Sequence, residues 1–262
     1  MLVRVLKYNS QPNSIKDLLL AQRIYLALAA LFITSLVVSN LIFQKFFSWN
    51  FFGLYTFEIS VGILPYPITF LITDIISEVY GKQKANQVVT VGIFASLFSL
   101  MIIYAADFVP ATAWSPIGDT LFSKVFGATG IAVFASMMAY LLAQYVDIHL
   151  FHFWKKLTNG KHLWLRNNFS TFMSQFVDTF SVLFLLCSFN KIQWDLFGTL
   201  LLSGFLFKVL IALFDTPFLY LAVYWMRRRF NLVPNDELNF EQINYETTTE
   251  SKDPVFAKKK KI

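Results

Sequence analysis

Charged residues are scarce in this chain of 262 residues, and cysteine is scarcer still. Asp, Glu, Lys and Arg make up 15% of the sequence, well below the roughly 25% of a soluble protein. The single cysteine, Cys187, excludes an internal disulfide and a cysteine-cluster metal site. The sequence also contains no Gly-rich phosphate loop, no H-E-x-x-H motif and no G-x-S-x-G motif. We therefore expect neither an enzyme nor a cofactor.

Apolar residues are abundant instead, at 56% of the chain with 30 Phe, against roughly 45–50% in a soluble protein. Apolar runs near the roughly 20 residues of a membrane-spanning helix predict six helices, at 24–47, 64–80, 87–104, 129–149, 168–189 and 196–225. The second is short, because Gly62, Pro65 and Pro67 interrupt the apolar run and leave an extended or re-entrant piece before it. The fold class is thus an all-α integral membrane protein with about six transmembrane helices.

Basic residues alternate between the segments that join these helices. Eighteen of the 22 Lys and Arg lie at the N-terminus, after the second and fourth predicted helices, or in the C-terminal tail, whereas the other connecting segments hold Lys45, Lys124 and Lys191. Because cytoplasmic segments carry the excess of Lys and Arg, we predict that both termini are cytoplasmic. The domains are a cytoplasmic segment at 1–23, a transmembrane domain at 24–230 and a polar, disordered tail at 231–262. We attribute the net charge of +6 to this topology rather than to nucleic-acid binding.

Several polar residues interrupt the apolar helices. A charge at the bilayer centre costs at least about 2.5–3.5 kcal/mol and usually faces a cavity or a partner. Asp74, Asp178 and Lys208 lie near the middle of the second, fifth and sixth predicted helices. The fifth helix also carries a polar stripe at spacings of three and four, which consists of Thr171, Ser174, Gln175, Asp178 and Ser181. The further candidates are Asn40, Glu78, Gln144 and Asp147.

Structural roles remain open for some of these residues. Lys208 can pair with Asp178 at similar depth, which we favour, or with Asp215 two turns along its own helix, in which case the pair would only hold helices together. Glu78 and Asp147 are expected nearer the cytoplasmic interface, where a charge costs less, so a structural role suits them as well as a functional one.

Short motifs resemble those of the queuosine precursor transporter family, also called the vitamin uptake transporter family. The most specific are D-x-x-x-E-V-Y-G at 74–81 and Q-x-x-D-T at 175–179. The similarity also includes 39–40, 67–74, 143–147, 166–168 and 208–209, and so covers nearly the whole transmembrane domain. It implies a multi-pass importer in a bacterial inner membrane. The substrate would be a 7-deazaguanine, namely preQ0, preQ1 or queuine, used for the queuosine modification of tRNA.

The candidate residues suit such a ligand chemically. A 7-deazaguanine presents adjacent N–H donors that a carboxylate can accept as a bidentate pair, which makes Asp178 and Asp74 the first candidates. An amide from Gln175 or Asn40 could bind O6 or a ring nitrogen, and Lys208 would balance one carboxylate. The predicted substrate-binding set is completed by Ser174, Glu78, Gln144 and Asp147. The expected partners are this small molecule and the lipid bilayer, with no nucleic acid. A homodimer is compatible with the sequence.

Two other functions fit the same composition. One is the substrate-binding membrane subunit of an energy-coupling vitamin transporter, which depends on a separate ATPase. The other is a ligand-free membrane scaffold, in which the buried charges are only structural.

Overall fold

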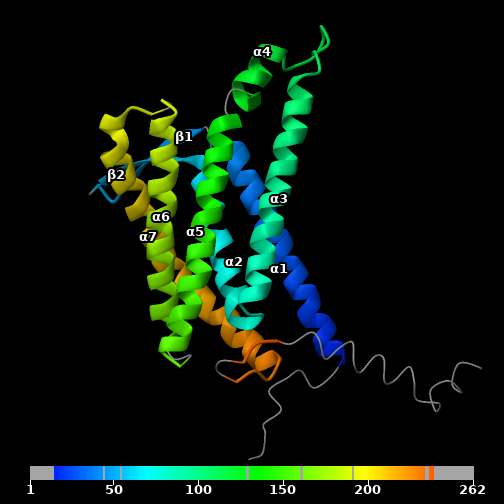
Figure 1. The fold of residues 1–262 in the computed structure, drawn as a ribbon, viewed down its shortest axis with the longest axis vertical. Helices are drawn as coiled ribbons and strands as arrows, with labels where there is room; N and C mark the ends of the chain where they lie inside the picture. Colours follow the sequence, from blue (N-terminus) through cyan, green and yellow to red (C-terminus); the bar gives the residue numbers. More distant parts are fainter. Residues whose placement is uncertain are drawn as a thin grey trace, which may run out of the picture.

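The computed structural model describes residues 15–43, 45–53, 55–127, 130–159, 162–190, 192–233 and 236–238. Within these ranges, five long helices pack around a shorter one (Figure 1). The long helices are α1 (Ile15–Ile42), α3 (Lys82–Asp107), α5 (Gly130–Leu157), α6 (Leu163–Ser188) and α7 (Phe197–Arg229), and the short helix is α2 (Tyr66–Val79). The short α4 (Asp119–Phe122) and a π-helical turn at Ser123–Gly127 join α3 to α5.

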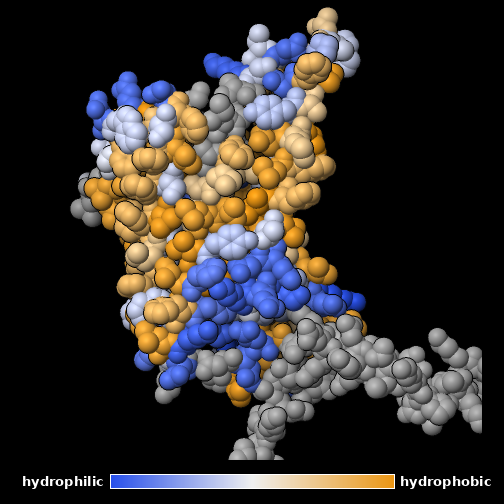
Figure 2. All heavy atoms as spheres, in the orientation of Figure 1, coloured by the Kyte–Doolittle hydropathy of each residue, from blue (hydrophilic) through white to orange (hydrophobic). Residues whose placement is uncertain are grey.

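The long helices have the length and composition of membrane spans. In the described residues, five helical segments are long and apolar enough to cross a membrane, namely Lys16–Ile42, Val61–Val79, Lys82–Asp107, Asn168–Ser188 and Trp194–Arg229. The remaining long helix, α5, has 28 residues, and about 42 Å of helix exceeds the roughly 30 Å of the hydrocarbon core. On the face seen in Figure 2, apolar residues cover the upper and middle part of the helices, and polar residues gather at the top and over the lower half. The chain is thus the all-α membrane protein that the sequence predicts.

The segment between α1 and α2 contains the extended piece that the sequence predicts before the short helix, but the first helix ends earlier than predicted. The first helix ends at Ile42 instead of continuing to Phe47, and a β-hairpin follows, formed by β1 (Phe46–Phe51) and β2 (Tyr55–Ser60). One face of the hairpin packs on α7, where the ring of Phe207 contacts those of Trp49 and Phe57 at centroid distances of 5.7 and 5.8 Å. The hairpin begins with Phe46 and Phe47, directly after the apolar run of α1, which is why hydropathy alone extended the helix to Phe47.

Close contacts tie the hairpin to α1 just before α2 begins. Ser39 donates a side-chain hydrogen bond to the carbonyl of Gly62, and Ser60 donates one to the carbonyl of Phe43. A Cβ atom at Gly62 would lie 2.7 Å from the Ser39 carbonyl oxygen, so a larger residue does not fit there. Pro67 then occupies the first turn of α2, where its missing N–H costs no helical hydrogen bond.

Both ends of the described chain lie at the same end of the bundle, opposite the hairpin. We call this the inner end and the hairpin end the outer end. Arg229 at the end of α7 forms an ion pair of 2.7 Å with Asp17 at the start of α1. An even number of crossings places the two termini on one side, so this contact agrees with six crossings.

The residues that follow α7 fold back across the inner end of α2. We call residues 230–233 and 236–238 the closing segment. Phe230, Leu232 and Leu238 are buried in the main hydrophobic core, and the Leu238 N–H donates to the Val79 carbonyl at 2.8 Å. The sequence predicts a disordered tail from Asn231 onward, but this part of it is packed. Residues 239–262 lie outside the described residues.

Candidate functional site

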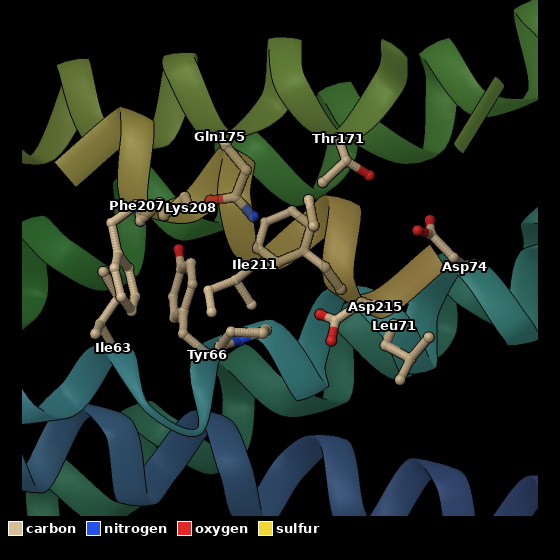
Figure 3. Close-up of a pocket in the computed structure, with 13 residues that line it drawn as sticks. Ile63, Tyr66, Leu71, Asp74, Thr171, Gln175, Phe207, Lys208, Ile211 and Asp215 are labelled. Atoms are coloured by element: carbon tan, nitrogen blue, oxygen red, sulfur yellow. The ribbon is translucent and has the colours of Figure 1, made fainter. Parts of the chain in front are cut away.

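Two cavities meet near the middle of the bundle. The outer cavity lies beneath the hairpin, among α1, β2, α6 and α7, and measures about 930 Å³ including solvent at its mouth. The inner cavity lies among α2, α6 and α7 and measures about 420 Å³ on the same basis (Figure 3). Ile63, Tyr66 and Lys208 line both cavities, and we call these three residues the partition.

The partition contains a buried ion pair. Lys208 Nζ lies 2.5 Å from Asp178 Oδ2, and Asp178 is only 2% exposed. The same ammonium lies 4.6 Å from the ring centroid of Tyr66, a cation–π distance. Asp178 is therefore the partner of Lys208, as we favoured over Asp215. Asp178 Oδ1 is buried and has no hydrogen-bond partner by distance and angle among the described residues, although the Tyr66 hydroxyl lies close to the same carboxyl group.

Aromatic rings support the partition from the side of α2. Tyr66, Phe70 and Tyr140 contact one another, with ring centroids 5.0 Å apart for Tyr66–Tyr140, 5.5 Å for Tyr66–Phe70 and 5.9 Å for Phe70–Tyr140. Gln144 donates to the Tyr140 hydroxyl at 2.6 Å and so positions that ring rather than lining either cavity. Sequence reasoning missed Tyr66 and Phe70, although both precede Asp74 at intervals of four on one face of a helix.

Acidic and amide side chains line the inner cavity below the partition. Gln175 and Thr171 reach it from α6, Asp74 from α2 and Asp215 from α7 (Figure 3). The carboxyl group of Asp74 also lies within hydrogen-bonding reach of that of Asp147 on α5.

Asp147 lies deeper in the protein than predicted. It is fully buried and accepts a 2.9 Å hydrogen bond from the Ser174 hydroxyl on α6. The sequence placed it near the cytoplasmic interface, because the apolar run ends at His149. The helix itself continues to Leu157, so Asp147 sits more than two turns inside its inner end. Neither Asp147 nor Ser174 is among the residues that line the two cavities.

Asn40 and Glu78 lie apart from this cluster and from each other. Asn40 lines the outer cavity from α1, and its side-chain Nδ2 is buried without a partner among the described residues. Glu78 lies instead at the inner end of α2, where Arg227 Nη2 approaches its Oε1 at 2.5 Å. The structure thus places Glu78 in an ion-pair cluster away from both cavities.

This ion-pair cluster, the inner network, consists of Glu78, Lys155, Arg227 and Glu237. Lys155 lies 3.1 Å from Glu237 and 4.0 Å from Glu78, so the network joins α2, α5, α7 and the closing segment. Nearby, the Tyr80 hydroxyl donates to the carbonyl of Ala21 at 2.8 Å. Burial raises the pKa of Tyr80 above its ordinary value, which keeps this hydroxyl a donor. The inner end of α2 is therefore held by polar contacts to α1, α5, α7 and the closing segment.

Comparison with known proteins identifies related chains. A family described as "Putative vitamin uptake transporter" matches residues 60–222. The chain is 28% identical over 180 residues to the "Probable queuosine precursor transporter" of Bacillus subtilis (strain 168), covering 68% of this chain and 74% of that protein. It is 26% identical over 159 residues to the "Queuosine precursor transporter" of Escherichia coli (strain K12), covering 60% and 69%. No solved structure matches significantly. The family match spans both partners of the buried ion pair and the Asp74–Asp147 contact.

Proposed function

The chain belongs to the putative vitamin uptake transporter family, and from that premise we propose that it imports queuosine precursors through the bacterial inner membrane. Its substrate would be a 7-deazaguanine such as preQ0, preQ1 or queuine, in keeping with the names of its two curated relatives. The observation that carries the proposal is the buried Asp178–Lys208 pair at the meeting point of two cavities, halfway through the bundle. Transporter binding sites lie at this depth, between helices that can rearrange.

Buried polar atoms without hydrogen-bond partners are the groups that would recognise the substrate. Among the described residues, Asp178 Oδ1, Gln175 Oε1 and Asn40 Nδ2 are buried, lack a hydrogen bond, and belong to residues that line a cavity. An unpaired buried polar group costs about 1–3 kcal/mol, so a ligand that completes these bonds gains affinity. The two acceptors match the N–H donors of a deazaguanine edge, and the amide donor matches O6.

The ring of Tyr66 is the stacking partner that sequence alone did not reveal. It lies between the two cavities, and its face already holds the Lys208 ammonium. A flat heterocycle bound at the partition would contact that ring, Lys208 and Asp178 together. We therefore assign substrate binding to Tyr66, Asp178, Lys208, Gln175 and Asn40. Asp74 lines the adjoining cavity, whereas Ser174, Gln144 and Asp147 support the site from behind, and Glu78 holds the inner end.

We further propose that the inner end faces the cytoplasm. Basic residues gather there on helices that are distant in sequence, namely Lys82, Lys84, Lys155, Lys156, Arg227, Arg228 and Arg229. Reporter fusions after Ile262 and after Lys191, two positions outside the described residues, should report opposite sides of the membrane. Fusions that report the same side would contradict this topology.

Uptake in cells that lack de novo synthesis tests the function. With this chain supplied on a plasmid, labelled preQ0, preQ1 or queuine should accumulate above the empty-vector level. Asp178→Asn should reduce ligand binding at least about 30-fold, because a charged hydrogen bond is worth about 2 kcal/mol. The matched control is Asp195→Asn, an exposed acid in the turn before α7, which should bind as the wild type does. Empty-vector uptake of all three ligands, by protein that reaches the membrane, would overturn the proposal.

A further inference from the structure

Acidic residues outnumber basic ones in the middle of the bundle. The central acids are Asp74 on α2, Asp147 on α5, Asp178 on α6 and Asp215 on α7. Among the described residues that surround the partition and the inner cavity, Lys208 is the one basic side chain, and Asp178 already neutralises it. Among the described residues, the other three acids form no ion pair. Uncompensated charge at this depth is costly, so its presence calls for a partner that arrives from outside the fold.

The contact between Asp74 and Asp147 identifies that partner. The two carboxyl groups are 3% and 0% exposed and lie within hydrogen-bonding reach of each other. A carboxylate only accepts hydrogen bonds, so a bond between two of them requires a proton on one. Two buried carboxyl groups that share a proton are well suited to binding and releasing it.

The surroundings stabilise one negative charge on the pair but not two. From α6, Ser174 donates to Asp147 Oδ1 at 2.9 Å, and the Ser170 and Thr171 hydroxyls approach Asp147 and Asp74 respectively. From α7, Asp215, a third acid, acts electrostatically on Asp74. These contacts supply hydrogen-bond donors and no positive charge.

The other titratable groups around the pair are engaged elsewhere. Tyr140 on α5 is held by Gln144, and Glu78, one turn below Asp74 on α2, pairs with Arg227. On α1 and α3, Tyr25 and Lys84 meet each other toward the inner end, where the Tyr25 hydroxyl donates to the Lys84 carbonyl. None of these side chains supplies the missing charge.

We propose that this chain is a proton-coupled importer in which the Asp74–Asp147 pair carries the proton that travels with the substrate. The proposal rests on the transport function given above. One proton enters the pair from the outer side while the substrate occupies the partition, and the same proton leaves to the inner side after the substrate does. Without the proton, the two carboxylates repel each other, which drives α2 and α5 apart. The protein that has released both substrate and proton therefore cannot return to the outer side with α2 and α5 packed as they are in the loaded state.

The position of Asp74 links substrate binding at the partition to proton binding at the Asp74–Asp147 pair. Tyr66, Phe70 and Asp74 follow one another at intervals of four on the same helix, so substrate contact at Tyr66 and the proton pair belong to one rigid element. A movement of α2 that exposes the partition to the inner side must therefore also change the Asp74–Asp147 contact. Coupling follows from this shared helix and needs no further connecting residues.

The wild-type protein in proteoliposomes gives the first test. The vesicles contain a trapped pH indicator, the membrane potential is clamped with potassium and valinomycin, and the probe is labelled preQ0, which lacks the amine of preQ1. Addition of preQ0 should acidify the lumen, and an outside-acid gradient of one pH unit should raise preQ0 accumulation about tenfold for one proton per ligand. A protonophore should abolish this accumulation.

Asparagine variants then locate the coupling. Asp147→Asn preserves the size of the side chain but cannot take part in a shared proton, so the ratio of uptake with and without the gradient should fall to about one. Asp74→Asn should give the same ratio and serves as the second variant if the first misfolds. The exposed control Asp195→Asn should keep the tenfold ratio. Because each value is a ratio within one variant, it does not depend on the amount of active protein.

The remaining outcomes separate the inference from the function on which it rests. Uptake that ignores the pH gradient and leaves the lumen pH unchanged would overturn proton coupling but not import. Uptake driven by a sodium gradient would do the same. A proton-coupled wild type whose two asparagine variants both keep the tenfold ratio would remove the pair from the mechanism. Absence of any preQ0 uptake or exchange would overturn the proposed function and the coupling together.

Discussion

The inner network and the central acids each contain a deeply buried carboxylate, but the two clusters differ in charge balance. Glu78 and Asp178 are each 2% exposed. At the inner end, two acids, Glu78 and Glu237, meet two basic residues, Lys155 and Arg227. In the centre, four acids meet one basic residue among those that the structure describes, Lys208. Burial alone therefore does not distinguish a structural charge from a functional one in this protein. The balance of acidic and basic residues does. A cluster with equal numbers of both is neutral, whereas a cluster with excess acids requires a ligand or a proton.

The largest effect should come from breaking the central ion pair. Lys208→Met leaves Asp178 buried and unpaired, which should lower the free energy of unfolding by about 3–5 kcal/mol and abolish uptake. The double variant Lys208→Met, Asp178→Leu should regain most of the stability but no uptake. Thermal unfolding in detergent and preQ0 uptake measure the two properties. A Lys208→Met protein with wild-type stability and uptake would contradict the assignment of Asp178 and Lys208 to a central binding site.

A smaller effect is expected from the balanced network. Arg227→Met removes the closest partner of Glu78, but Lys155 remains 4.0 Å away, so the loss should be about 2 kcal/mol. The double variant Glu78→Leu, Arg227→Met should regain both stability and uptake, unlike its central counterpart. If this double variant is stable but does not transport, the inner network takes part in transport and the contrast between the two clusters is wrong.

Single hydroxyl groups allow a finer comparison. Ser174→Ala removes a buried hydrogen bond to Asp147 and should cost about 1 kcal/mol of stability while changing the response of uptake to a pH gradient. Thr90→Val removes a hydrogen bond to the Tyr145 hydroxyl on the exposed surface of α3 and α5 and should change stability by less than about 0.5 kcal/mol. Its uptake should respond to the gradient as in the wild type. If uptake responds equally to the pH gradient in the two variants, the buried hydrogen bond between Ser174 and Asp147 has no special role in transport.

The smallest effect belongs to the exposed ion pair between α1 and α7. Arg229 is 43% exposed in its side chain, so its pair with Asp17 should contribute about 1 kcal/mol or less. Arg229→Gln should unfold within a few degrees of the wild type and transport normally. A loss of uptake in this variant would show that the inner end tolerates less change than its charge balance suggests.

Hydropathy predicted the helices, but not all of their ends. The apolar part of α1 begins near Ile24, yet the helix begins at Ile15, because Lys16, Asp17 and Arg23 lie near the inner end, where polar side chains can reach water. The closing segment was missed for a related reason. Leu232 and Leu238 are isolated apolar residues in a polar stretch, and only the folded chain shows that they cover α2.

The sequence predicted those site residues that can be recognised one at a time, without knowledge of their neighbours in space. Asp74, Asp178 and Lys208 stand out because charges are rare in apolar helices, and the structure confirms the pairing of the last two. The contact between Asp74 and Asp147 could not be predicted, because it joins two helices whose relative position depends on packing. Tyr66 could not be selected from sequence either, among 11 Tyr and 30 Phe of similar surroundings.

The closing segment also has a consequence for the order in which the protein is made. Glu78 meets Arg227 across 149 residues, and the Val79 carbonyl accepts from the N–H of Leu238, the last described residue. Since synthesis proceeds from the N-terminus, α2 must wait in the membrane for its final neighbours until α7 and the segment after it have left the ribosome. A nascent chain arrested after α6 would therefore hold a Glu78 that lacks Arg227 and an Asp178 that lacks Lys208. Such a chain should be a preferred substrate for membrane quality-control proteases, whereas one released after Leu238 should escape them.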